Sequence, residues 1–189
     1  MQQFETPSAV DLIVRNRSGW IEVTTHTAPT TEVDLVPLHA DAEDLVSHTR
    51  IDATPTDTGH RVVVEVPEPD SWRGGIGRGS GIGWRWGSGS VGGVGVRVRV
   101  PEASRLHIES ASADVRALGP CGATRIHTAS GDVSLDQVTE AEVETASGEV
   151  RVEQVEGSLR AYTASGDIQI RQAGGPVHLR SASGSQTLM

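Results

Sequence analysis

Apolar and polar residues alternate in short segments on both sides of a corner motif that recurs through the second half of the chain. The corner reads Ala-Ser-Gly-acid or a close variant. Its five copies are Ala111-Ser112-Ala113-Asp114, Ala129-Ser130-Gly131-Asp132, Ala146-Ser147-Gly148-Glu149, Ala164-Ser165-Gly166-Asp167 and Ala182-Ser183-Gly184-Ser185, spaced 18, 17, 18 and 18 residues apart. Because alternation with a period of two is typical of β-strands, each repeat predicts two short strands joined at a corner.

The apolar positions keep one register through all five repeats. The fifth and third positions before the corner hold Leu106/Ile108, Thr124/Ile126, Ala141/Val143, Leu159/Ala161 and Val177/Leu179. The first and third positions after it hold Val115/Ala117, Val133/Leu135, Val150/Val152, Ile168/Ile170 and Gln186/Leu188. A hydroxyl residue precedes each corner, namely Ser110, Thr128, Thr145, Thr163 and Ser181.

A repeat of this length cannot bury its own apolar side, whereas stacked repeats bury one continuous column. The sequence therefore predicts an all-β fold, a parallel β-solenoid with about 17 to 18 residues per coil. Equivalent strands would lie roughly 4.8 Å apart. Right-handed coiling is favoured, because parallel crossovers have that hand almost everywhere.

The same register recurs near the N-terminus. It comprises Leu12, Val14, Asn16, Ser18-Gly19, Ile21 and Val23, with Trp20 at the acid position. We expect this segment to supply a further coil. Less regular strands are predicted at 31–36, 49–53, 61–66 and 94–100, and a short helix at 40–47, where acids occupy the first turns. The whole chain, 1–189, is predicted to be one solenoid domain in which 102–189 is the regular stack.

Composition narrows the class of protein. The chain has 189 residues and a net charge of −9, which argues against duplex nucleic acid as the main partner. No segment approaches the roughly 18 unbroken apolar residues of a membrane span, and the first residues lack the features of a signal peptide, so we expect a cytoplasmic protein. Cys121 is the single cysteine, which excludes an internal disulfide and a cysteine cluster for zinc.

A Gly-, Arg- and Trp-rich segment, 72–95, interrupts the pattern and is predicted to be a flexible loop within the domain. It holds 11 of the 22 glycines and three of the four tryptophans. Tryptophan and arginine together can stack on bases or sugars or hold an acidic partner. The candidate binding residues are Trp72, Arg73, Arg78, Trp84, Arg85 and Trp86. The alternative is a loop whose tryptophans fold back over one end of the solenoid.

The acids that follow the corner form a column, Asp114, Asp132, Glu149 and Asp167. Like charges stacked about 5 Å apart repel, so these acids either bind a cation or point into water while capping turn amides. The Gly-Gly-x-Gly-x-Asp nonapeptide of calcium-binding solenoids is missing from the chain. We therefore predict no metal site and no cofactor.

Catalysis finds little support in the sequence. His107, His127 and His178 occupy outward strand positions, and no acid pair is evident around them in the sequence. The corner serines are fixed by the repeat, and Cys121 lies in a Gly/Pro turn. We expect a protein that is not an enzyme.

Three features of the chain resemble the bacterial putative adhesin family, a domain of unknown function. They are the serial Ser-Gly-Asp-aliphatic-x-aliphatic units, the opening Phe4-Glu5-Thr6-Pro7 and the strand ending Val98-Arg99-Val100-Pro101. The similarity spans nearly the whole chain and is strongest over 96–189. The resemblance implies a β-helical domain without a known catalytic residue.

Three functions fit these observations. The leading one is a non-catalytic solenoid scaffold that presents a face or an end to a protein or another macromolecule. The first alternative is a self-assembling, bactofilin-like polymer. The second is a carbohydrate-active β-helix enzyme, which would need clustered acids on a groove.

The last repeat suggests self-association. Gln186 replaces the aliphatic residue of earlier coils, and no capping helix follows. An open parallel strand offers unpaired amides and carbonyls. We expect the chain either to associate end to end through residues 177–189 or to be a shortened version of a longer protein.

Overall fold

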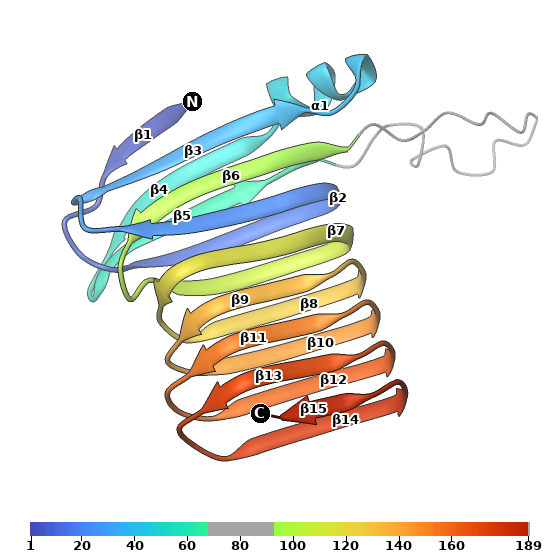
Figure 1. Cartoon of the computed structure of the whole chain (residues 1–189). Coiled ribbons are helices and arrows are strands. Elements are labelled where there is room, and N and C mark those ends of the chain that lie inside the picture. Colours follow the sequence, from blue (N-terminus) through green and yellow to red (C-terminus); the bar gives the residue numbers. More distant parts are fainter. Residues whose placement is uncertain (68–92, 189) are drawn as a thin grey trace, which may run out of the picture.

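Two layers of strands wind downward from the N-terminal to the C-terminal end of the molecule in the computed structural model, which describes residues 1–67 and 93–188 (Figure 1). The described residues form one 15-stranded sheet, and the expectation of an all-β fold is confirmed. The strands are β1 (Gln2–Glu5), β2 (Val10–His26), β3 (Thr30–Pro37), β4 (Arg50–Thr56), β5 (Gly59–Glu65), β6 (Val94–Pro101), β7 (Arg105–Cys121), β8 (Thr124–Ser130), β9 (Val133–Val138), β10 (Ala141–Ser147), β11 (Val150–Val155), β12 (Leu159–Ser165), β13 (Ile168–Ala173), β14 (Val177–Ser183) and β15 (Gln186–Leu188).

The repeats pair with one another in parallel. One layer runs through β7, β8, β10, β12 and β14, and the other through β7, β9, β11, β13 and β15. Ala141 pairs with Thr124 on one side and with Leu159 on the other, and Val150 lies between Val133 and Ile168 in the same way. The positions that match in the sequence are therefore the positions that pair in the sheet.

The N-terminal segment joins this arrangement as the sequence predicts. β2 pairs in parallel with β7, which places Leu12 beside Leu106, Gly19 beside Ala113 and Trp20 beside Asp114. Both strands are 17 residues long and run through the corner without a break. β2 and β7 thus contribute to both layers, whereas each later repeat divides into two strands.

Antiparallel strands widen the sheet at the β2 end, which the sequence analysis does not predict. β6 pairs in parallel with β2, then β3 pairs antiparallel with β6 and β1 antiparallel with β3. On the other layer, β5 pairs in parallel with β2, and β4 pairs antiparallel with β5. A tight turn is enough to join β4 and β5, because antiparallel neighbours can be connected by as few as two residues.

The predicted short helix is confirmed as η1 (Ala40–Ala42) followed by α1 (Glu43–Ser47). Leu45 and Val46 are half-buried and pack against the core.

The core is the space between the two layers, filled by the inward-facing residues of each strand. Val143 on β10 and Val150 on β11 are fully buried, as the register predicts. Burial decreases toward the last coil, where Val177 and Leu179 are half-buried and Leu188 is 57% exposed. The outward-facing residues of the two layers form the surface of the molecule.

Candidate functional site

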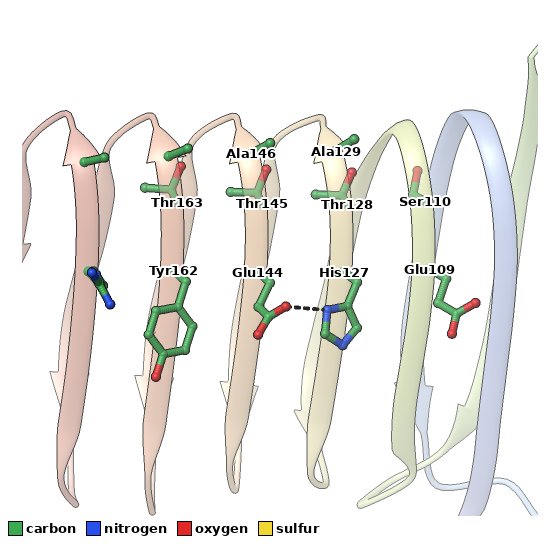
Figure 2. A pocket seen from close by; sticks show the side chains of 13 residues that line it. Glu109, Ser110, His127, Thr128, Ala129, Glu144, Thr145, Ala146, Tyr162 and Thr163 are labelled. Carbon is green, nitrogen blue, oxygen red and sulfur yellow. Dashed lines mark hydrogen bonds and ion pairs between the residues drawn. The ribbon is translucent and has the colours of Figure 1, made fainter.

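An open trough of about 710 Å³ crosses the outer face of β7, β8, β10, β12 and β14 (Figure 2). We call this feature the trough. It is lined by Glu109, Ser110, His127, Thr128, Ala129, Glu144, Thr145, Ala146, Tyr162, Thr163, Ala164, Arg180 and Ala182.

The repeat itself creates the trough. Four of the five corners contribute an alanine with a minimal side chain, so the floor consists of Ala129, Ala146, Ala164 and Ala182. Two positions earlier each strand carries a long side chain on the same face, because residues i and i+2 of a strand point the same way. The parallel register aligns these long side chains into one wall, in the order Glu109, His127, Glu144, Tyr162 and Arg180.

The wall contains an ordered set of polar contacts. Arg15 Nε donates to Glu109 Oε2 at 2.9 Å, and His107 Nε2 lies 2.9 Å from Glu109 Oε1. Next along the wall, His127 Nδ1 and Glu144 Oε2 are 3.0 Å apart (Figure 2). The hydrogen bond with His107, and after it the one from Arg15, lower the pKa of Glu109, so this carboxylate is held ionised.

The surroundings of the histidines correct the sequence analysis. His127 stands between Glu109 and Glu144 in the wall, although no acid pair is evident around it in the sequence. The His107 and His127 rings meet edge to face with their centres 6.2 Å apart. These acids and histidines lie on neighbouring coils rather than near one another in the sequence, so only the strand register brings them together.

The column of acids after the corner is a structural feature. The Asp132 N–H donates to Asp114 Oδ1 at 3.0 Å, the Glu149 N–H to Asp132 Oδ1 at 2.9 Å and the Ser185 N–H to Asp167 Oδ1 at 2.7 Å. These aspartates therefore bind a backbone amide of the next coil, which favours the capping alternative. Within residues 1–67 and 93–188, no group of three or more His, Cys, Asp or Glu side chains is arranged to hold a metal ion.

A second hollow, of about 300 Å³, lies nearer the start of the same strands. Four of its charged side chains form two pairs: Arg125 Nε donates to Glu142 Oε2 at 2.8 Å, and Arg105 Nε lies 3.4 Å from Asp11 Oδ1. These pairs leave the hollow less suited to a charged ligand.

The predicted binding residues of the Gly-rich segment lie outside the described residues. They are Trp72, Arg73, Arg78, Trp84, Arg85 and Trp86. The wall of the trough is not evident in the sequence, because its residue types change from coil to coil. A variable outward position two residues before an invariant alanine is the signal that could have revealed it.

Cys121 is buried, and we predict that its thiol is unreactive in the native protein. Burial, and after it the charge of Asp136, raise the pKa of the thiol to about 11, so almost none is present as the reactive thiolate at pH 8. A colorimetric disulfide reagent at pH 8 is expected to modify it at least tenfold faster in denaturant than in buffer. Equal rates of modification in denaturant and in buffer would contradict the burial of Cys121.

Comparison with known proteins now places the chain. The Toastrack DUF4097 family matches residues 8–189. The chain belongs to this family. No curated protein matches the Toastrack chain.

Solved structures similar to this Toastrack domain include two proteins with names related to adhesion. A putative adhesin from Bacteroides fragilis is 11% identical, with 100% of this chain and 95% of that chain covered and a TM-score of 0.43. A putative cell adhesion protein from Clostridium sporogenes is 10% identical, with 95% and 93% covered and a TM-score of 0.48. Neither helix of the described part of the chain is long and apolar enough to span a membrane.

Proposed function

We propose that this Toastrack domain is a non-catalytic scaffold that binds a macromolecule through the trough. The observation that carries the proposal is the trough itself, an open surface across five strands with an alanine floor and an ordered polar wall. The backbone groups of β7, β8, β10 and β12 are engaged in the sheet on both sides, so a ligand there meets a preformed surface built from side chains.

The chemistry of the wall favours binding over hydrolysis. A glycosidase needs one carboxylic acid with a raised pKa to protonate the leaving group. The pKa of Glu109 is lowered instead, and Glu144 lies beside His127. The alternative of a carbohydrate-active enzyme is therefore the weaker one.

The test compares the wild-type chain with Ala146→Trp, which fills the middle of the trough, on arrays of glycans and peptides. The proposal predicts that the wild type binds at least one ligand that Ala146→Trp no longer binds. Mass spectrometry is expected to show that the bound ligand stays intact. Cleavage of a bound ligand, or binding that Ala146→Trp leaves unchanged, would contradict it.

We also infer that the domain is a single right-handed parallel β-solenoid with 17 to 18 residues per coil, in which 102–189 is the regular stack. The parallel pairing of matched repeat positions supports the coil length. The hand rests on the general chirality of parallel crossovers.

The Gly-rich segment is a second proposed contact region, on sequence grounds. Replacing residues 74–93 with a short linker is expected to leave the far-UV circular dichroism of the strands unchanged, because no apolar period in this segment contributes to the stack. Loss of the strand signal would show that Trp84 or Trp86 belongs to the core. Undiminished binding after the deletion would remove the segment from the site.

Self-association is the remaining proposal, and it is the feature shared with the bactofilin-like alternative. Among the described strands, β14 pairs only with β12, and β15 only with β13, so both have an open edge. We expect light scattering to show concentration-dependent association that Leu179→Lys weakens. A wild-type chain that stays monomeric at high concentration would exclude it.

A further inference from the structure

We propose that the ligand of the trough is a neutral, linear glycan. This inference rests on the proposed function and specifies the chemistry of its partner. Five strands at a spacing of about 4.8 Å give the trough a length of roughly 19 Å, enough for several sugar rings in a row. The alanine floor leaves room for them over four of these strands, β8, β10, β12 and β14.

Tyr162 supplies the stacking surface. Its side chain is half-buried, and Figure 2 shows the ring lying over its own strand with one face toward the viewer. A flat aromatic ring with a polar tip suits a ligand that has one apolar C–H face and hydroxyls at its rim. Glu144 and Arg180 are its neighbours on the adjacent strands and provide an acceptor and a donor on either side.

The balance of charge favours a neutral ligand. Glu109 is ion-paired with Arg15 and hydrogen-bonded to His107, and Glu144 is hydrogen-bonded to His127. A cationic polymer would compete with these contacts, and an anionic one would approach a protein of net charge −9. Hydroxyl groups can bind to the remaining lone pairs of the carboxylates without displacing the existing partners, because a carboxylate accepts about four hydrogen bonds.

The spacing of the wall favours a glycan over a peptide. Successive rings of a linear, equatorially linked pyranose chain advance by about one strand spacing, so each ring meets the next side chain of the wall. An extended peptide advances about 3.3 Å per residue and does not keep step with strands about 4.8 Å apart. Peptide binding by strand addition needs a free strand edge, and among the five strands of the trough only β14, at its end, has one. Strand addition could therefore not occupy the length of the trough.

The experiment is isothermal titration of the full chain with three neutral β-1,4-linked hexasaccharides: cellohexaose, xylohexaose and mannohexaose. Hexagalacturonate and the chitosan hexamer serve as the acidic and basic comparisons. We expect at least one neutral hexamer to bind with a dissociation constant between about 10 µM and 1 mM, more tightly than both charged ones.

Two trough variants and one matched control define the site. Tyr162→Ala is expected to weaken binding at least tenfold, and Ala146→Trp to abolish it. Ser134→Trp, which places the same bulky side chain on β9 in the other layer, is expected to bind like the wild type. Circular dichroism verifies the fold of each variant.

Several results would overturn the inference: no binding of any neutral hexamer, tighter binding of a charged one, or undiminished binding by Tyr162→Ala and Ala146→Trp. The outcomes also separate this inference from the proposed function. A peptide from the array that binds the wild type but not Ala146→Trp would refute the glycan and keep the scaffold. Shortening of a hexamer during incubation would refute the scaffold itself.

Discussion

Gly148→Val is expected to destabilise the domain by more than about 3 kcal/mol or to prevent folding. Gly148 has φ +140°, a backbone conformation that residues with a Cβ rarely adopt. A Cβ at this position would also lie 2.3 Å from the Gly131 carbonyl oxygen. That oxygen belongs to the backbone of the preceding coil, so no side-chain movement relieves the clash. Thermal unfolding followed by circular dichroism measures the effect.

Ser147→Ala is the matched control for this corner. Ser147 precedes Gly148 and is exposed, so its substitution is expected to change stability by no more than about 0.5 kcal/mol. If the valine variant melts within a few degrees of the wild type, the coils do not approach one another at the glycine corner as described.

Val143→Ala and Val150→Ala are each expected to cost about 1 to 3 kcal/mol, because each substitution removes buried methyl groups from the middle of the stack. Both side chains are 0% exposed, one in each layer. Urea denaturation gives the free energy of unfolding. Arg116→Ala, at an exposed outward position of β7, is the control and is expected to have little effect. Unchanged stability in both valine variants would refute the stacking register.

The strand register of the repeats could be predicted from the sequence because one short pattern encodes it at every coil. The alternating apolar residues define the inward face, and the glycine marks the place where adjacent backbones approach closely. Even the N-terminal coil, with Trp20 in place of the acid, pairs with β7 at the expected positions.

The antiparallel strands and the trough could not be predicted in the same way. β3 and β4 follow no repeat, and they pair antiparallel with β6 and β5, which the parallel repeat pattern does not encode. The trough depends on side chains such as Glu109, His127 and Glu144, which differ in type and lie on separate coils. Only the folded register shows that they form one wall.

The most direct test of the central claim, that the trough binds a neutral, linear glycan, is an NMR titration of the chain labelled at its alanine methyl groups. The probe is cellohexaose, xylohexaose or mannohexaose. The account predicts shifts for the floor residues Ala129, Ala146 and Ala164, and unchanged signals for Ala53 on β4 and Ala173 on β13. Floor signals that stay in place when all three probes reach millimolar concentration, or shifts confined to Ala53 and Ala173, would contradict it.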